Sequence, residues 1–454
     1  MEKVVDYINS NRQKYVEELK NFLKIPSIST LAENKADMTT AAKFVADRLT
    51  DAGMENVRII ETKGHPLVYA DWLHSPGKPT VLIYGHYDVQ PVDPIDLWDS
   101  PPFEPTIKDD KIFARGATDD KGQMYMHIKS VEAYFKTVGK LPLNVKFIIE
   151  GEEEIGSGNL DKFVNDNQKM LQCDAVLISD TSLYGPGIPT LTYGLRGLCY
   201  MEVIVTGPNR DLHSGTFGGG VDNPINVLAE MISKLKDNNG KIKIPGFYKD
   251  VVNLSKKERE NFKRLPFSEK QYAKTLGVKE LKGEKGYTTL ERVWARPTLD
   301  CNGIFGGFTG EGAKTVLPSK ATAKISMRLV PNQDPKKIAK LFSSYLKKIA
   351  PKTVKLEVSD LHGAYPIATS LDDKATKAAA IALSKVFEKK TVFMREGGSI
   401  PIVVSFAKKL KASPVLLGMG LNTENLHSPN EHFNLNHFHL GILSSAFFLD
   451  EFSK

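Results

Sequence analysis

The sequence predicts an α/β fold with a mainly parallel sheet, flanked by helices. Three apolar runs end abruptly in polar residues: TVLIYG (80–85), LNVKFIIEG (143–151) and DAVLISD (174–180). Between them lie stretches with helical periodicity, over 38–53 and 121–139. Continuous apolar strands separated by helices indicate a parallel sheet covered on both faces. The same pattern returns near the end of the chain, with helices over 374–387 and 437–452 and a strand over 412–420.

The middle of the chain predicts a separate α+β domain. Strands and helices alternate there: strand 199–207, helix 224–237, strand 321–331, helix 335–350 and strand 353–361. A long charged segment from 248 to 296 lies between the first helix and the second strand. This order suits a small antiparallel sheet that carries two helices, as in ferredoxin-like units. Since 454 residues exceed one compact core, we expect an inserted domain at 192–366. A discontinuous catalytic domain then comprises 1–191 and 367–454.

Composition narrows the functional classes. The opening segment is charged and amphipathic and lacks a secretory signal, and no apolar run is long enough to span a bilayer. The three cysteines are scattered without paired spacing, so a cytoplasmic location is expected. The formal charge of +7 raises the question of nucleic acid. Acids interrupt the basic runs, and no nucleic-acid-binding motif is present, which favours a solvated surface.

Imidazoles and carboxylates gather at the predicted strand ends. Because parallel strands of an open sheet place their carboxyl ends at one rim, these residues should converge. They are His86 and Asp88 after the first run, Glu152–Glu154 after the second, Asp180 after the third, His427 a few residues after the late strand, and Asp119 with Asp120 before the helix at 121–139.

Each group by itself has an ordinary structural interpretation. A lone histidine such as His86 is usually a buried structural residue, three consecutive glutamates usually form a solvated turn, and Asp119 with Asp120 would serve as a helix N-cap. Asp180 alone would end a strand in an Asx turn. Together they would crowd several carboxylates at one rim, where mutual repulsion raises their pKa values unless divalent cations are bound. The joint pattern therefore predicts a metal site.

These residues stand in motifs that resemble a known family, the dinuclear zinc hydrolases that include carnosinase, cytosolic nonspecific dipeptidase, acetylornithine deacetylase and succinyl-diaminopimelate desuccinylase. Six motifs carry the resemblance in the family's order: GHYDVQP (85–91), RGATDDKG (115–122), GEEEIGSG (151–158), ISDT (178–181), DLHSGTFGG (211–219) and REGGSIPI (395–402). A seventh segment, IPGFYKDVV (244–252), resembles the dipeptidase branch in particular.

The resemblance implies a role for each member of the predicted site. Asp119 would bridge two metal ions, with His86 and Asp180 completing one ion and Glu154 and His427 the other. Asp88 would orient the imidazole of His86. Glu153 would be the base that activates the water bridging the metals. The nitrogen and oxygen ligands fit zinc, and they also suit manganese or cobalt.

The resemblance also implies substrate contacts and a partner. His213 would stabilise the oxyanion, reaching the site from the inserted domain of the other subunit in a homodimer. Arg328 would bind the terminal carboxylate of the substrate, because its guanidinium suits that anion. The backbone N–H groups of the turn Gly397, Gly398 and Ser399 would bind the same carboxylate, and Thr315 is a further candidate for substrate binding. His432, His437 and His439 are expected to be surface or helix residues.

The predicted function is metal-dependent hydrolysis of dipeptides or short peptides with a free C-terminal carboxylate. An N-acyl-amino-acid deacylase with the same dinuclear site is the alternative within hydrolases. From other classes, a catalytically silent scaffold or a basic nucleic-acid binder is the remote alternative. The silent interpretation requires the loss of Glu153 or of a ligand, and the sequence retains all of them.

Overall fold

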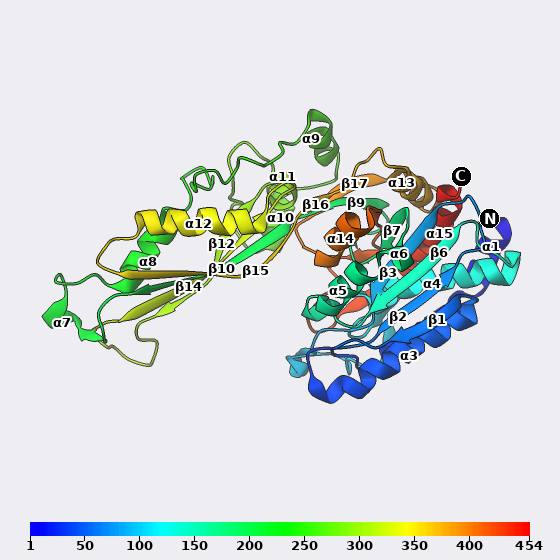
Figure 1. The fold of residues 1–454 in the computed structure, drawn as a ribbon, viewed down its shortest axis with the longest axis horizontal. Coiled ribbons are helices and arrows are strands. Elements are labelled where there is room, and N and C mark those ends of the chain that lie inside the picture. The colour runs from blue at the N-terminus through cyan, green and yellow to red at the C-terminus, as the bar shows by residue number, and fades with distance from the viewer. The chain divides into compact units, whose positions relative to one another are not determined.

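The computed structural model describes residues 1–454 and divides into two compact units (Figure 1). The first unit comprises Met1–Tyr193, Thr369–Met394 and Pro401–Lys454, and the second comprises Gly194–Ala368 and Arg395–Ile400. The second unit begins and ends within two residues of the expected 192–366 insertion. It also includes Arg395–Ile400, whereas the sequence predicts these residues to be part of the catalytic domain.

The first unit is built on a mixed sheet whose order begins β1-β2-β6-β3-β7-β18-β9. Strands β6, β3, β7 and β18 run parallel, and β1, β2 and β9 add antiparallel neighbours. The bounds of these strands are β1 Glu55–Ile60, β2 Leu67–Trp72, β3 Thr80–His86, β6 Asn144–Glu150, β7 Ala175–Ile178, β9 Thr190–Leu195 and β18 Ser413–Leu416. The parallel strands are the continuous apolar runs of the sequence, because both faces of the sheet are covered.

Helices pack on this sheet and share one apolar core with it: α1 Glu2–Ser10, α2 Arg12–Leu23, α3 Lys35–Ala52, α4 Lys121–Val138, α13 Lys374–Phe387 and α15 Leu435–Phe452. The unit also contains α5 Gly158–Asp166, α6 Gln168–Leu171 and α14 Pro401–Ser405, which lie outside this core. Helix α4 is buried from Lys121 to Tyr134, since it packs against both α15 and α3. Its C-cap is Gly139, whose φ of 74° is a left-handed conformation that favours glycine.

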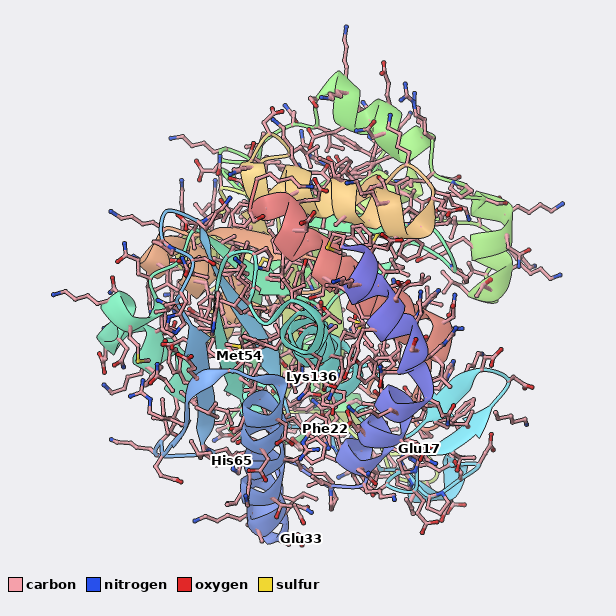
Figure 2. The ribbon with its side chains drawn as sticks, turned by 90° about the vertical axis from the view of Figure 1, so that its right-hand side faces the viewer. Glu17, Phe22, Glu33, Met54, His65 and Lys136 are labelled. Atoms are coloured by element: carbon pink, nitrogen blue, oxygen red, sulfur yellow. The ribbon has the colours of Figure 1, made fainter.

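The N-terminal helices show how the outer layer of this unit is attached. Phe22 on α2 is fully buried and stacks on Phe44 of α3 with ring centroids 4.8 Å apart. Glu17 and Glu33 lie at the surface (Figure 2). The apolar positions of both helices therefore face the core, as their sequence periodicity indicates.

Two small sheets of the first unit connect distant segments of the chain. The strands β4 Thr106–Lys108, β5 Lys111–Phe113 and β20 His432–Asn434 form one, and β8 Ser182–Leu183 pairs with β19 Gly420–Leu421 in the other. Pairing of β5 with β20 holds the segment after His427 beside the loop that contains Asp119.

The second unit contains a four-stranded antiparallel sheet in the order β12-β14-β10-β15, with α8 Pro224–Ser233 and α12 Pro335–Ile349 packed against it. The strand bounds are β10 Gly197–Thr206, β12 Thr298–Gly306, β14 Lys320–Leu329 and β15 Lys355–Ala364. Alternate residues of β10 are buried, as expected for a sheet with one covered face. The predicted fold class is thus confirmed, with a mainly parallel central sheet and a separate α+β unit.

Two details of the second unit differ from the sequence prediction. Strand β12 was not predicted, because its sequence TLDCNGIFG contains two glycines and shows little apolar alternation. The charged segment 248–296, to which we assigned no structure, contains three short helices: α9 Lys256–Lys263, α10 Glu269–Thr275 and α11 Thr289–Ala295. Capping boxes begin α9 and α11, at Ser255 and Thr288.

Among the smaller elements, β11 of the second unit carries one predicted site residue, His213. Strand β11 Leu212–His213 pairs with β13 Val316–Leu317, and α7 Ser214–Phe217 follows directly. Strands β16 Ile367–Ala368 and β17 Val392–Glu396 lie where the chain passes between the units. No helix of the structure combines the length and the apolar character needed to cross a membrane.

Candidate metal centre

Five predicted ligands form two groups in the first unit. His86, Asp119 and Asp180 make one, and Asp119, Glu154 and His427 make the other, with the candidate ligand atoms of each group within 4.8 Å of one another. His86 is the last residue of β3, Asp180 follows β7, and Glu154 lies in a short 3-10 helix after β6, Glu153–Ile155. The carboxyl ends of parallel strands bring these residues together, as the sequence predicts.

Asp119 belongs to both groups because its two carboxylate oxygens face different histidines. Its Oδ1 lies 3.2 Å from Nε2 of His86, and its Oδ2 lies 2.8 Å from Nε2 of His427. Nε2 of His427 is also 3.4 Å from Oε2 of Glu154. A carboxylate placed between two imidazoles in this way suits a bridging ligand.

Unsatisfied buried atoms show that these groups fit cations. Nδ1 of His86 lies 3.0 Å from the carbonyl oxygen of Asp88, which can only accept, so Nδ1 carries the proton of the neutral ring. Nε2 is then a bare electron pair directed at the carboxylate of Asp119, and it is buried without a hydrogen bond. Oε1 of Glu154 is also buried without a partner. Divalent cations would satisfy all these atoms.

The pKa values show the same conflict between like charges. Burial, followed by the charge of Asp119, raises the pKa of Glu154 to about 8. The same two causes raise the pKa of Asp180 well above its usual value. Burial works in the same direction on Asp119, yet the neighbouring imidazoles of His427 and His86 lower its pKa. The hydrogen bond with Asp119 raises the pKa of His427 to about 9. This acidic cluster is electrostatically incomplete without cations.

The structure separates the acids that stand side by side in the sequence. Glu152 accepts hydrogen bonds from the backbone N–H of His65 and the side chain of Asn159, so it has a structural role. Glu154 belongs to a ligand group. Glu153 makes no side-chain hydrogen bond, and burial with the charges of Asp119 and Asp88 raises its pKa. An uncommitted carboxylate beside the ligands is what a general base requires.

The adjacent residues Asp119 and Asp120 also make different contacts. The peptide bond between them is cis. Asp119 faces the two histidines, whereas Oδ2 of Asp120 accepts the backbone N–H of His86 at 3.3 Å. Asp120 occupies the N-cap position of α4 but makes no side-chain cap bond, so the N-cap interpretation accounts for neither side chain.

Asp88 connects one ligand to the acids after β6. Its Oδ1 lies 3.3 Å from Nδ1 of His86, and its two oxygens accept the backbone N–H groups of Glu153 and Glu154 at 3.2 and 3.1 Å. It is fully buried. One carboxylate thus sets the orientation of the His86 ring and the position of the 3-10 helix.

Glu431 is a residue of this site that the sequence did not indicate to us. It is fully buried, and its carboxylate accepts bonds from four donors of the loop that contains Asp119: Nη1 of Arg115 at 2.8 Å and the backbone N–H groups of Gly116 at 3.0 Å, Thr118 at 3.0 Å and Asp119 at 3.2 Å. Since Glu431 follows His427 by four residues, it fixes the ligand segments to each other. The sequence signal that could have identified Glu431 is its position as a charged residue between His427 and the C-terminal helix α15.

Three histidines near the C-terminus were expected to be surface or helix residues, and the structure changes this expectation in part. His432, His437 and His439 are only 8%, 4% and 7% exposed, so none is a surface residue. His437 and His439 do lie on a helix, α15, but His432 lies on β20. Burial lowers the pKa of His439 to about 4, and Nε2 of this residue lies 2.9 Å from Oδ1 of Asn9. These residues pack the C-terminal helix and stand outside both ligand groups.

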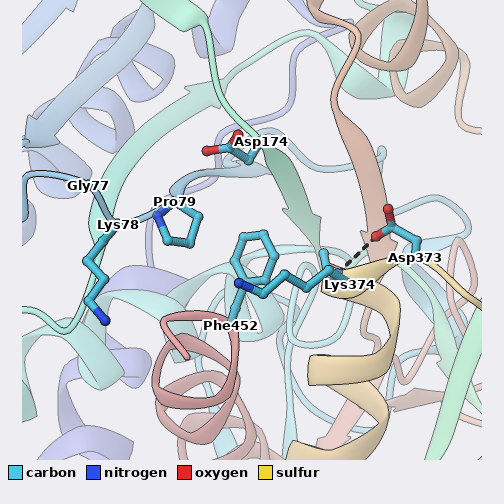
Figure 3. A pocket seen from close by; sticks show the side chains of 8 residues that line it. Gly77, Lys78, Pro79, Asp174, Asp373, Lys374 and Phe452 are labelled. Atoms are coloured by element: carbon cyan, nitrogen blue, oxygen red, sulfur yellow. Dashed lines mark hydrogen bonds between the residues drawn. The ribbon is translucent and has the colours of Figure 1, made fainter.

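Polar groups at the opposite edge of the sheet, where the parallel strands begin, are hydrogen-bonded within the fold. A cavity of about 530 Å³ lies there, beside the first residues of β3 and β7 (Figure 3). Asp174 accepts the backbone N–H of Thr80 at 2.7 Å, Asp373 accepts that of Ala375 at 2.9 Å, and Lys78 donates to the carbonyl of Ser453. The polar groups named at this edge thus serve the fold, whereas Nε2 of His86 and Oε1 of Glu154 at the carboxyl edge have no hydrogen-bond partner.

The other predicted residues lie in the second unit. Nη1 of Arg328, on β14, donates to Oγ of Ser399 at 3.2 Å, so Arg328 and the 397–399 turn are in contact. Gly398 is exposed. His213 is also exposed, and its Nδ1 accepts the backbone N–H of Gly215 at 3.0 Å. The carbonyl of Thr315 accepts the N–H of Ser214, which places Thr315 beside His213.

Comparison with known proteins agrees with this architecture. Residues 82–450 match the model of peptidase family M20/M25/M40. The Cys-Gly metallodipeptidase DUG1 of Candida albicans is 35% identical over 100% of this chain and 98% of its own length. The human Beta-Ala-His dipeptidase is 32% identical over 99% of this chain and 92% of its own length.

Solved structures give the same result. The M20 family metallo-carboxypeptidase Sso-CP2 of Sulfolobus solfataricus superposes with a TM-score of 0.85 at 35% identity, covering 97% of this chain and 99% of the other. Human carnosine dipeptidase 1 has a TM-score of 0.83 at 32% identity, covering 100% and 98%. The chain therefore belongs to peptidase family M20/M25/M40, which confirms the resemblance found in the motifs.

Proposed function

We propose that this protein is a metal-dependent dipeptidase, which hydrolyses dipeptides or short peptides that have a free C-terminal carboxylate. The observation that carries the proposal is the sharing of Asp119 by two ligand groups, beside the uncommitted carboxyl of Glu153. Full-length similarity to the Cys-Gly and Beta-Ala-His dipeptidases supports this substrate class.

Five residues would hold two divalent cations: His86, Asp119, Asp180, Glu154 and His427. The donor set is nitrogen and oxygen without thiolate, which suits zinc best and also accommodates manganese or cobalt. Bound there, the cations would polarise the scissile carbonyl and acidify the attacking water.

Glu153 would accept the proton of the attacking water and deliver it to the leaving amine. A base that must release its proton again works best with a pKa near the working pH, and burial raises the pKa of this carboxyl in that direction. Asp88 would hold Glu153 in place through the backbone N–H that it accepts. It would keep the His86 ring in the tautomer whose Nε2 is free for a cation.

Residues of the second unit would recognise the substrate. Arg328 and the Gly397–Ser399 turn would bind the C-terminal carboxylate, with Thr315 as a further contact. A guanidinium and backbone N–H groups are suitable donors for that anion. His213 would donate to the developing oxyanion, and its exposed ring is available for this.

We also propose a homodimer formed through the second unit, in which His213 acts on the partner's centre. Mixing inactive His213→Ala with inactive Glu153→Gln should then restore part of the activity, because some sites in the mixed dimers are complete. Absence of recovery despite demonstrated subunit exchange would place His213 in its own chain. The cytoplasm is the proposed location, and three free cysteines agree with it.

The deciding experiment compares three substrates with the metal-reconstituted protein. A dipeptide should be cleaved much faster than its C-terminal amide, since the amide lacks the anion, and faster than the matching N-acetyl amino acid. Equal rates on the acid and the amide would remove the carboxylate anchor. Faster cleavage of the acetyl compound would establish the deacylase alternative.

A further inference from the structure

Two guanidinium groups of the second unit meet at one turn. Nη1 of Arg328 donates to Oγ of Ser399 at 3.2 Å, and Nε of Arg196 donates to the carbonyl oxygen of Gly397 at 3.3 Å. Arg328 lies on β14, opposite Leu198 of β10, and Arg196 immediately precedes β10. We call Arg196 and Arg328 the arginine pair.

The turn is closely fitted to Arg196. Oγ of Ser399 donates to the backbone carbonyl of Arg196, and the backbone N–H of Arg196 donates to the carbonyl of Glu396 at 3.3 Å. A Cβ added to Gly397 would lie 2.7 Å from Nη2 of Arg196. Glycine at 397 therefore lets this guanidinium lie directly against the turn that the substrate carboxylate is proposed to use.

The arginine pair has no acidic partner. Neither guanidinium forms a salt bridge, although both side chains are partly buried. Burial and the charge of Arg328 lower the pKa of Arg196 to about 10, and Asp300 is the acid that opposes this change. Asp300 is itself exposed and lies 3.3 Å from Nζ of Lys236. Two like charges are thus held together without neutralisation, which is costly unless an anion joins them.

Other buried arginines of this chain have a carboxylate partner. Arg115 lies 2.8 Å from Glu431, and Arg296 lies 2.8 Å from Glu284. Their side chains are 1% and 6% exposed. Where an arginine serves the fold, the chain supplies the acid itself. The arginine pair departs from this pattern, which indicates a ligand.

We propose that the arginine pair is a subsite for two carboxylates, and that it selects dipeptides whose C-terminal residue is glutamate or aspartate. Arg328 and the turn would bind the α-carboxylate, and Arg196 would bind the side-chain carboxylate. A neutral C-terminal residue brings only one negative charge to two guanidiniums, so it leaves one of them unpaired. This inference rests on the proposed function and adds Arg196 as a specificity residue.

Matched dipeptides test the selection. Ala-Glu and Ala-Gln have nearly the same shape and differ in one charge. We expect kcat/KM for Ala-Glu to exceed that for Ala-Gln by about 10-fold or more, as a charge-assisted bidentate contact implies. Arg196→Met should bring this ratio close to one, and Arg196→Lys should leave an intermediate ratio because it keeps the charge without the fork. Arg210→Met, which removes an exposed arginine of the same unit, should leave the ratio unchanged.

Direct binding separates this inference from the proposed function. Calorimetry of free glutamate and free glutamine with the metal-reconstituted protein requires no turnover, and glutamate should bind about 10-fold more tightly. If no dipeptide is hydrolysed but glutamate is preferred, the proposed function is wrong and the subsite stands. Equal affinities, a wild-type ratio near one, or a preference that persists in a folded Arg196 variant would overturn the inference. The unfolding midpoint of each variant shows that it is folded.

Discussion

The acidic cluster of the first unit and the arginine pair of the second unit are opposite in charge. Both hold like charges together that the chain itself does not fully neutralise. The first brings four carboxylates to two imidazoles, and the second brings two guanidiniums together without an acid. Elsewhere the chain satisfies buried charges internally, as Glu431 does for Arg115. Charged groups that the chain leaves without a partner are therefore the proposed ligand-binding groups, for cations in the first unit and for an anion in the second.

The largest effect is expected from removing the residue that both ligand groups share. Asp119→Ala should lower the bound metal from two ions per chain to fewer than one. It should also reduce turnover by more than the roughly 10²–10⁴-fold that loss of a general base costs. Metal analysis after dialysis measures this, and Asp120→Asn is the matched control that should keep both ions. Two ions bound to the alanine variant at wild-type affinity would show that Asp119 does not bridge.

Glu153→Gln should separate chemistry from metal binding. The substitution removes the proton acceptor but no ligand, so we expect two ions per chain and a kcat lower by roughly 10²–10⁴-fold. The neighbouring substitution Glu154→Gln should instead lose metal. Near-normal turnover by the first variant would end the assignment of Glu153 as the base.

A smaller effect is expected from the carboxylate that supports the site without belonging to it. Glu431→Gln keeps the size of the side chain but weakens the bonds to the Asp119 loop, and loss of such support typically costs 10–100-fold in metal affinity. Competition with a chelator measures that affinity, and the exposed Glu33→Gln serves as the control. An unchanged affinity with a lower unfolding midpoint would mean that Glu431 acts only on stability.

The smallest expected effect is on the pH dependence of stability, and it concerns His127, whose surroundings differ from those of His427. Beside Asp119, the pKa of His427 rises to about 9, whereas burial without an opposite charge lowers that of His127 to about 3. His127 lies 2.9 Å from Oγ of Ser445 and 2.7 Å from Oγ of Ser179. Its folded pKa is below the unfolded value, so its contribution to stability is present above about pH 6.5 and declines as the pH falls toward 3.

Unfolding by urea between pH 7.5 and pH 5 should show this decline. The wild type should lose about 1.4 kcal/mol per pH unit more than His127→Gln below pH 6.5, because only the wild type must take up this proton on unfolding. Parallel slopes for the two proteins would mean that His127 does not remain neutral in the folded state.

The parallel core and the places of the candidate ligands at its edge could be predicted from the amino-acid sequence alone. Continuous apolar strands end at His86, Glu150 and Ile178, and the chemistry lies at or just beyond those ends because the direction of parallel strands fixes the edge. Local periodicity was also sufficient for α4 and α15. It failed for β12, whose glycine-containing sequence becomes a strand only through pairing with β14.

The different roles of neighbouring acids could not be predicted from the sequence, because they depend on tertiary contacts. The three consecutive glutamates 152–154 are identical in residue type. They differ in their neighbours, which come from distant parts of the chain: His65 contacts the first, Asp88 the second and His427 the third. Glu431 and Arg196 were missed for the same reason. The donors around Glu431 lie more than 300 residues away, and Arg196 meets a turn 201 residues away. Whether a charge is paired is a property of three-dimensional neighbours, which no local pattern encodes.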